Sequence, residues 1–174
     1  GPLERVPTCS TRRGIAPQAL RRAMDICLPN KSDPAVANVR AALAVALQGL
    51  LRSAEYCDNE TSKASSKSSL LDKLPTRADI VKLDDEKLVF MMRPCKNMNF
   101  LSGKTVPLVI GAGGKEVDAV AEVRNMLRVD PTRNIGLPAD EVPMFRDPTT
   151  NKPLTSSRML SVVKRLMSSI GEDP

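Results

Sequence analysis

Hydrophobic and polar positions alternate with two different periods along the chain, and these periods predict where helices and strands lie. Apolar side chains recur every three to four residues in Gly14–Leu28 and again in Thr155–Ile170, each with charged side chains on the opposite face. Between them, Pro34–Cys57 is apolar nearly all round, as expected of a helix enclosed by others. We therefore predict two amphipathic helices near the ends of the chain and one buried, continuous helix from Pro34 to Cys57.

Helix-starting signals support these boundaries. Pro17 stands near the start of the first helix, where a missing backbone N–H costs nothing. Asp33 precedes Pro34 and predicts an N-cap for the buried helix, and Thr155 predicts an N-cap for the last one.

The period changes in the middle of the chain. The segments "ADIVKL" (78–83), "KLVFMM" (87–92) and "KTVPLVI" (104–110) are short and rich in β-branched or large apolar residues, so they predict a small antiparallel sheet. The Ser- and Lys-rich segment "DNETSKASSKSS" (58–69) predicts an exposed loop. A further helix is predicted after "GAGGKE" (111–116), because Val117, Val120 and Leu127 fall on one stripe. The expected fold class is mainly α with a small antiparallel β-sheet (α+β).

Length and composition fit one domain. The chain has 174 residues, of which 41% are hydrophobic, 26% charged and only 2% aromatic, so its core has to be built from Leu, Val, Ala, Ile and Met. Residues 1–4, "GPLE", are interpreted as the remnant of an expression tag, which leaves 5–174 as the domain. The longest apolar run, 36–51, is interrupted by Asn38, Arg40 and Gln48, so no membrane span is predicted, and no signal peptide is visible.

The cysteine and histidine content argues against a metal site. The chain has no histidine, and Cys9, Cys27, Cys57 and Cys95 are far apart, with no pair at ligand spacing. Three of them lie in apolar stretches and are interpreted as buried thiols, which are typical of a reducing compartment. We therefore expect no metal, no cofactor and an intracellular location.

A formal charge of +6 fits a polyanionic partner, although a basic surface without a ligand fits it equally well. A nucleotide ligand is not predicted. The segment "SGKT" (102–105) ends like a phosphate-binding loop, but Met98 stands where the first glycine of that motif would be. The segment "GAGG" (111–114) lacks the third glycine and the βαβ context of a dinucleotide-binding turn, so it is interpreted as a flexible turn.

Arg52 and Glu55 are candidate site residues near the end of the predicted buried helix. Their spacing of three places both on one helix face. In one interpretation Arg52 complements the negative end of the helix dipole and pairs with Glu55. In the other, the buried helix holds the guanidinium rigidly, the carboxylate supports it, and its planar donors face a phosphate.

Two other basic features also have two interpretations. Lys96 lies in the connection between two predicted strands, either as a solvated turn residue or near a partner's phosphate. The polar face of the last helix, with Arg158, Lys164 and Arg165, is either solvated surface or a face that lies against a duplex. The hydroxyl and guanidinium groups at the start of that helix suit phosphate or base contacts.

The order of these segments resembles the catalytic domain of tyrosine recombinases, the phage-integrase family of DNA strand-exchange enzymes, and integrases of mobile elements in particular. The resemblance runs from about Gly14 to the end of the chain, through "GIAPQALRRAM", "AALAVALQGLLRSAEYC", "LPTRADIVKL", the hairpin that carries Lys96, "GKTVPLVI" and "PMFRDPTTNKPLTSSRMLSVVKRLMSSIG". Its most specific part is "GLLRSAEYC", which is similar to the family's first box, a glycine-leucine-arginine followed three residues on by Glu.

The resemblance implies a mechanism that needs neither metal nor cofactor. A tyrosine hydroxyl attacks a phosphodiester of double-stranded DNA and gives a 3′-phosphotyrosine and a free 5′-hydroxyl, and a second strand's 5′-hydroxyl reverses the attack. Arg52 is similar to the first of two arginines that meet the developing charge, Glu55 to the residue that supports it, and Lys96 to the lysine that protonates the leaving oxygen. The candidate DNA contacts are Asn97, Lys104, Thr155, Ser156, Arg158, Lys164 and Arg165.

The same resemblance predicts that the chain is the front part of a catalytic domain. It contains no His-x-x-Arg segment, and Tyr56, its only tyrosine, is interpreted as a core residue rather than the nucleophile. We expect the fragment to be inactive alone and monomeric, the full-length protein to form tetramers on DNA, and both to be located with the DNA, in the nucleus of a eukaryote. The alternatives are a non-catalytic DNA-binding module derived from a recombinase and a helical protein-interaction domain.

Overall fold

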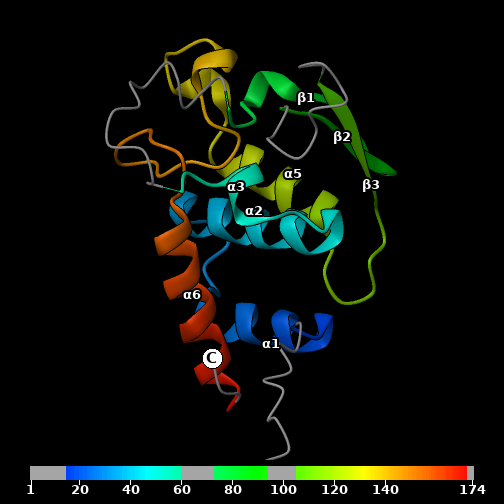
Figure 1. The fold of residues 1–174 in the computed structure, drawn as a ribbon, viewed down its shortest axis with the longest axis vertical. Coiled ribbons are helices and arrows are strands. Elements are labelled where there is room, and N and C mark those ends of the chain that lie inside the picture. Colours follow the sequence, from blue (N-terminus) through cyan, green and yellow to red (C-terminus); the bar gives the residue numbers. More distant parts are fainter. Residues whose placement is uncertain (1–14, 60–72, 94–104, 172–174) are drawn as a thin grey trace, which may run out of the picture.

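The computed structural model describes residues 15–59, 73–93 and 105–171, which form a mixed α+β structure (Figure 1). The α-helices are α1 (Pro17–Cys27), α2 (Pro34–Gly49), α3 (Ser53–Tyr56), α5 (Ala119–Val129) and α6 (Ser156–Ser169). The strands are β1 (Ile80–Leu83), β2 (Lys87–Met92) and β3 (Val106–Gly111). Short 3-10 turns form η1 (Arg77–Asp79), η3 (Thr132–Asn134) and η4 (Ala139–Glu141). The predicted combination of helices with a small antiparallel sheet is confirmed.

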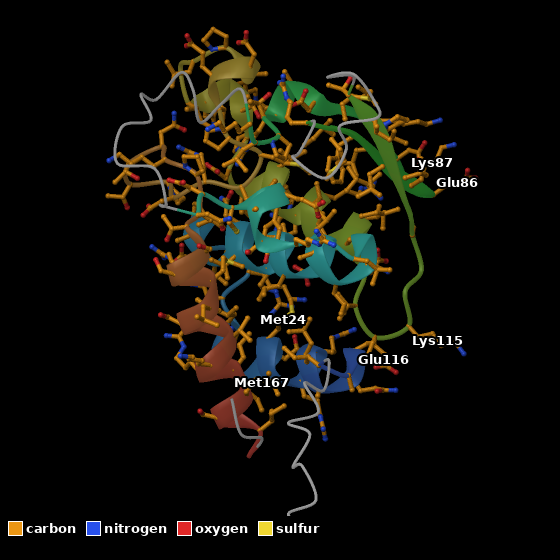
Figure 2. All side chains as sticks on the ribbon, viewed as in Figure 1. Met24, Glu86, Lys87, Lys115, Glu116 and Met167 are labelled. Atoms are coloured by element: carbon orange, nitrogen blue, oxygen red, sulfur yellow. The ribbon has the colours of Figure 1, made fainter. Side chains whose placement is uncertain are left out.

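Helix α2 is the centre of the fold, as its apolar sequence predicts. Every residue from Ala37 to Val45 is buried. Helix α5 packs along α2 on the side of the sheet, α1 lies on the opposite side, and α6 runs from near α2 down to α1 (Figure 1). Met24 lies between α1 and α2, and Met167 lies where α6 approaches α1 (Figure 2). The aliphatic core predicted from the composition therefore surrounds one helix.

The three strands form an antiparallel sheet in the order β1-β2-β3. In β2 the buried side chains alternate with partly exposed ones, so Leu88, Phe90 and Met92 face the core. Ile80 pairs with Phe90 on one side, and Phe90 pairs with Leu108 on the other. The predicted first strand starts later than expected, because residues 77–79 form the turn η1 instead.

The predicted helix caps are confirmed. The Asp33 side chain accepts a hydrogen bond from the Ala35 N–H at 2.8 Å, and the Thr155 hydroxyl accepts one from the Arg158 N–H at 3.2 Å. Each cap satisfies a backbone donor that the first turn of a helix leaves without an internal partner.

The prediction of one continuous helix from Pro34 to Cys57 is wrong. Helix α2 ends at Gly49, because Leu50 adopts the left-handed conformation with φ 52° and its N–H bonds back to the carbonyls of Ala46 and Leu47. A side chain at Gly49 would meet Leu108 of β3 at 3.0 Å, so the turn also depends on close packing against the sheet. The chain then reverses into the separate short helix α3 (Figure 1).

The "GAGG" segment (111–114) contains the last residue of β3 and a positive φ at Gly113, and its last glycine is tightly enclosed. A Cβ at Gly114 would lie 2.1 Å from the Val117 carbonyl oxygen and 2.6 Å from Gln48 Nε2. Gln48 in turn accepts a hydrogen bond from the Ala119 N–H at 2.7 Å. Glycine at this position therefore allows the start of α5 to join the end of α2.

Helix α6 has the predicted polar face and a narrower apolar face than expected. Met159 and Leu166 are buried, whereas Leu160 of the same helix is 55% exposed. No helix in the described parts of the chain is long and apolar enough to cross a membrane.

Arg40 joins three helices from within the core. Its side chain is fully buried, and its five N–H donors all have acceptors. Two bonds go to the carbonyls of Met24 and Leu28 at the C-terminal end of α1, where a cation is also favoured by the helix dipole. The others go to the carboxylates of Glu122 on α5 and Asp25 on α1. The arginine therefore fixes α1 and α5 against α2.

The turn after α2 carries strain that a substitution should relieve. Leu50 is 87% exposed and has a positive φ, so its side chain gains little from packing while its Cβ opposes the backbone conformation. We predict that Leu50→Gly raises the free energy of unfolding by up to about 1 kcal/mol, measured by urea denaturation. Leu50→Ala removes the same contacts but keeps the Cβ, so it should give no gain; equal effects of the two variants would contradict the strain.

Candidate functional site

Arg52 is an exposed residue at the start of α3 and not, as predicted, at the end of a long helix. The Glu55 Oε2 accepts a hydrogen bond from the backbone N–H of Arg52 at 2.7 Å, as an N-terminal cap. The predicted pairing of the carboxylate with the guanidinium is therefore corrected, because Glu55 holds the backbone of Arg52. Among the described residues no carboxylate forms an ion pair with this guanidinium.

The segment after α3 returns to the start of α6. The Asp58 N–H donates to the Leu154 carbonyl at 2.9 Å, and the Ser156 N–H donates to the Asp58 carbonyl at 2.8 Å. Five residues separate Arg52 from Asp58, so the two Cα atoms are at most about 20 Å apart, and closer here because four of the five are helical. The structure thus brings two of the predicted site segments, far apart in the sequence, into one region.

The exposed face of α6 carries the predicted cations. Arg158, Lys164 and Arg165 are all exposed. Arg158 and Arg165 are seven residues apart and so lie on one stripe of the helix, with Ser161 between them. Arg158 Nη1 lies 3.4 Å from Asp147 Oδ2, in a solvent-exposed ion pair that contributes little to stability.

The two predicted hydroxyl contacts have different surroundings. The Thr155 hydroxyl caps α6 and lies 3.3 Å from the Ser157 hydroxyl, so it is already engaged inside the protein. Ser156 is partly buried beside it. The remaining predicted residues, Lys96, Asn97 and Lys104, lie outside the described residues, and their roles stay predictions.

Tyr56, predicted to be a core residue, is only partly buried and packs against the edge of the core. Its ring meets Phe145 edge-on at a centroid distance of 6.4 Å. Burial raises the pKa of the Tyr56 hydroxyl, and burial raises the pKa of the adjacent Cys57 thiol to about 12. Both shifts favour the protonated forms of these groups and so lower their reactivity as nucleophiles. Of the other predicted buried thiols, Cys27 is only partly buried, and Cys9 and Cys95 lie outside the described residues.

The structure contains a buried charge cluster that the sequence patterns do not predict. The Asp130 carboxylate, at the end of α5, accepts from Arg77 of η1 at 2.7 Å and from Arg146 Nε at 2.9 Å. The Asn38 amide of α2 donates to the same carboxylate at 3.0 Å. The Asn38 carbonyl oxygen accepts from the backbone N–H of Arg146 at 3.0 Å. The interruption of an apolar helix by Asn38 and Arg40 was the available signal, since buried polar groups need partners.

Two guanidiniums share one carboxylate in this cluster, so it carries a net positive charge. Burial alone would raise the pKa of Asp130, but the hydrogen bonds from Arg146, Asn38 and Arg77 outweigh it and lower that pKa to about 2. Burial also lowers the pKa of the Arg77 guanidinium, and the hydrogen bond and negative charge of Asp130 offset part of that lowering. The cluster, which we call the Asp130 cluster (Asn38, Arg77, Asp130 and Arg146), ties α2, η1, α5 and the loop at residue 146 together.

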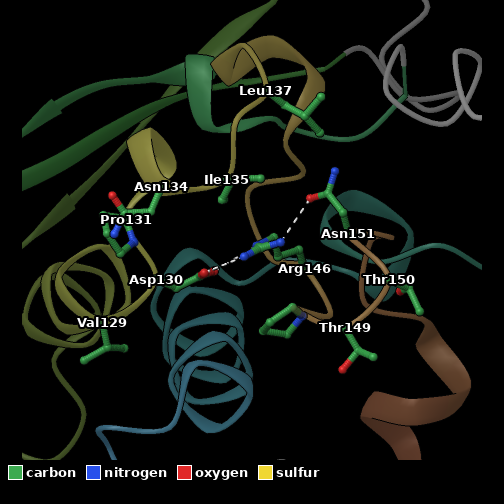
Figure 3. Close-up of a pocket in the computed structure, with 11 residues that line it drawn as sticks. Val129, Asp130, Pro131, Asn134, Ile135, Leu137, Arg146, Thr149, Thr150 and Asn151 are labelled. Atoms are coloured by element: carbon green, nitrogen blue, oxygen red, sulfur yellow. Dashed lines mark hydrogen bonds and ion pairs between the residues drawn. The ribbon is translucent and has the colours of Figure 1, made fainter.

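A cleft of about 450 Å³ opens beside the Asp130 cluster (Figure 3). Arg146 lies at its floor, joined to Asp130 on one side and to Asn151 on the other. The lining combines polar and apolar residues: Val129, Asp130, Pro131, Asn134, Ile135, Leu137, Arg146, Pro148, Thr149, Thr150 and Asn151. In the described parts of the chain, no group of three or more acidic, cysteine or histidine side chains is placed to hold a metal ion.

Comparisons with models of known protein families, with characterised proteins and with solved structures give no match for this chain.

The Asp130 cluster predicts a stability that depends on pH. The pKa of Asp130 is 3.8 in its ordinary state and about 2 when folded, so its contribution is complete above about pH 4 and is lost as the pH falls towards 2. We predict that Asp130→Asn lowers the free energy of unfolding at pH 7 by about 3 kcal/mol, because it leaves two buried guanidiniums without an anion.

The same substitution should reduce the loss of stability between about pH 4 and pH 2 by about 2 kcal/mol. Both effects can be measured by urea denaturation across the pH range. Asp140→Asn, which changes an exposed carboxylate in η4, is the matched control and should leave the stability nearly unchanged. An Asp130→Asn profile parallel to that of the unsubstituted protein would contradict this role of Asp130.

Proposed function

We propose that the protein binds double-stranded DNA and is part of a strand-exchange enzyme of the tyrosine-recombinase type. The observation that carries the proposal is the backbone bridge between Asp58 and Thr155, because it joins the segment of Arg52 to the start of α6. The two features that the sequence resemblance assigned to phosphate and DNA contact therefore belong to one region of the fold.

The chemistry of this region suits a nucleic-acid backbone. Arg52 presents a planar guanidinium from a turn that is fixed by the Glu55 cap, and such a fork can bind a phosphate through two parallel hydrogen bonds. The exposed cations of α6 supply the weaker, sequence-independent attraction that dominates DNA affinity. In the proposed role Arg52 meets the charge that develops on the attacked phosphate, and Glu55 positions it through the backbone.

Strand cleavage would need a nucleophile from outside the described residues. Tyr56 is the only tyrosine of the 174 residues, and its partly buried ring packs edge-on against Phe145 of the core. The same observation favours a second candidate function, a recombinase-derived module that binds DNA without cutting it. The two functions differ in whether Arg52 is needed for cleavage or only for binding.

The first prediction concerns the salt dependence of DNA binding. If Arg165 contacts a phosphate, Arg165→Ala should make the negative slope of log affinity against log salt shallower by about 0.9, because one counterion fewer is released on binding. The measurement is fluorescence anisotropy with a labelled duplex between about 50 and 200 mM salt. Arg128→Ala, an exposed arginine on α5, removes the same charge on another helix and should leave the slope unchanged.

A flat affinity of the unsubstituted protein across this salt range would overturn the DNA-binding proposal. An equal loss of slope in both variants would indicate a general effect of net charge and would contradict a binding face on α6.

The second prediction concerns Arg52. Because Arg52 is exposed, Arg52→Ala should change the free energy of unfolding by no more than about 0.5 kcal/mol while weakening DNA binding. Arg52→Lys keeps the charge but loses the paired donors, so it should restore only part of the affinity. A large loss of stability with unchanged DNA affinity would instead favour a protein-interaction domain in which Arg52 is structural.

The third prediction is that the 174-residue protein binds DNA without forming a covalent adduct. A nicked duplex that traps 3′-phosphotyrosine, followed by denaturing electrophoresis, tests this directly. The appearance of an adduct that Tyr56→Phe abolishes would show that Tyr56 is the nucleophile and would overturn its interpretation as a structural residue.

A further inference from the structure

The cleft beside the Asp130 cluster has more positive charge than its own residues neutralise. Arg77 and Arg146 share the single carboxylate of Asp130. Asp147, the next residue after Arg146, directs its side chain to Arg158 and to the Thr149 N–H. The floor of the cleft is therefore a buried cation with only part of its charge matched.

Two donors at this floor have poor internal partners. Arg146 uses Nε and Nη2 on Asp130, but its Nη1 has only the Asn151 Oδ1, at 3.4 Å. The Asn151 Nδ2 is buried and has no hydrogen-bond partner. Figure 3 shows the Asn151 oxygen turned towards Arg146 and its nitrogen on the opposite side, towards Leu137. Buried donors without acceptors are uncommon in native proteins and mark a place where an acceptor is missing.

The backbone conformation at Asn151 holds its side-chain amide beside Arg146. Asn151 has a φ of 55°, a conformation that asparagine tolerates better than most residues. Its N–H donates to the Asp147 carbonyl at 2.8 Å, and the Asp147 N–H donates to the Lys152 carbonyl at 2.9 Å. The tight loop 147–152 therefore holds the Asn151 amide beside Arg146, with its oxygen on the Arg146 side and its unpartnered nitrogen facing away from it.

We propose that this cleft binds a phosphate group through Arg146 Nη1 and Asn151 Nδ2. A phosphate supplies several strong acceptor oxygens and the negative charge that the floor lacks. The cleft, at about 450 Å³, also leaves space for the group that carries the phosphate, with Ile135, Leu137 and Pro148 as apolar contacts. The lining of this site shares no residue with the proposed contacts of Arg52 and α6, so it can exist whether or not those contacts bind DNA.

In the test, the protein is titrated at constant ionic strength with three probes, and binding of each is measured by isothermal titration calorimetry. Inorganic phosphate tests the group itself, adenosine monophosphate tests a free nucleotide as the source, and a short duplex tests a backbone phosphate. Phosphate should bind with a one-to-one stoichiometry, and the side-chain amide resonance of Asn151 should shift in a ¹⁵N–¹H spectrum. The exposed amide of Asn125, bonded to the Lys31 carbonyl, is the internal control and should not shift.

Asn151→Asp replaces the donor with an anion and should weaken phosphate binding at least roughly tenfold, since hydrogen bonds to charged groups are the stronger ones. Asn30→Asp changes the net charge equally at an exposed position away from the cleft, and its phosphate affinity should stay within about twofold. If Asn151→Asp does not fold, Asn151→Gly removes the amide while accepting the positive φ.

The outcomes separate this proposal from the proposed function. A loss of phosphate and nucleotide binding in the Asn151 variants, with duplex binding intact, assigns the cleft to a free phosphate compound. A parallel loss of duplex binding assigns it to a DNA phosphate. No phosphate binding at millimolar concentration, or binding that the Asn151 variants leave unchanged, overturns the proposal, and neither result bears on the salt dependence of the α6 face.

Discussion

The fold depends on how two buried arginines and one buried carboxylate are paired with each other. Asp130 faces Arg77 and Arg146 with its two carboxylate oxygens, and Asn38 supplies the remaining donor from the central helix. Buried charges are tolerated only where partners surround them, so these groups must meet in one arrangement. Three chain segments that are distant in the sequence, η1, the end of α5 and the loop at residue 146, are thereby held in one arrangement against α2. Arg40 does the same for the opposite side of that helix, with carbonyls and carboxylates as its partners.

A rigid centre has consequences for the surface. The left-handed turn at Leu50 directs the chain away from the end of α2 and into α3. The Glu55 carboxylate then holds the backbone N–H of Arg52 by a hydrogen bond. The backbone bridge between Asp58 and Thr155 connects the segment that follows Arg52 to the start of α6. A candidate phosphate-binding arginine is thus positioned by backbone geometry instead of by a paired carboxylate, which leaves its guanidinium available to an external anion.

The two proposed sites use opposite strategies for binding phosphate. The region of Arg52 and α6 presents exposed cations, whose attraction is strong at low salt and falls as counterions accumulate. The cleft at Arg146 and Asn151 presents buried donors whose charge is only partly matched, so its attraction should be less sensitive to salt. The loop that contains Asp147 and Lys152 lies between them, since it begins at Arg146 and leads into α6. Ionic strength therefore provides a means to separate their contributions.

The sequence by itself determined the local elements: the caps at Asp33 and Thr155, the strand β2, and the burial of α2 all follow from side-chain type and spacing. It did not determine where α2 ends, because the left-handed turn at Leu50 depends on backbone contacts with α2 and packing against β3, and leucine gives no local signal for it. Nor did it reveal the Asp130 cluster, whose members are up to 108 residues apart, as Asn38 and Arg146 are. Hydrophobic periodicity is a local property and can be read from one segment, whereas the pairing of charges depends on which segments the completed core brings together.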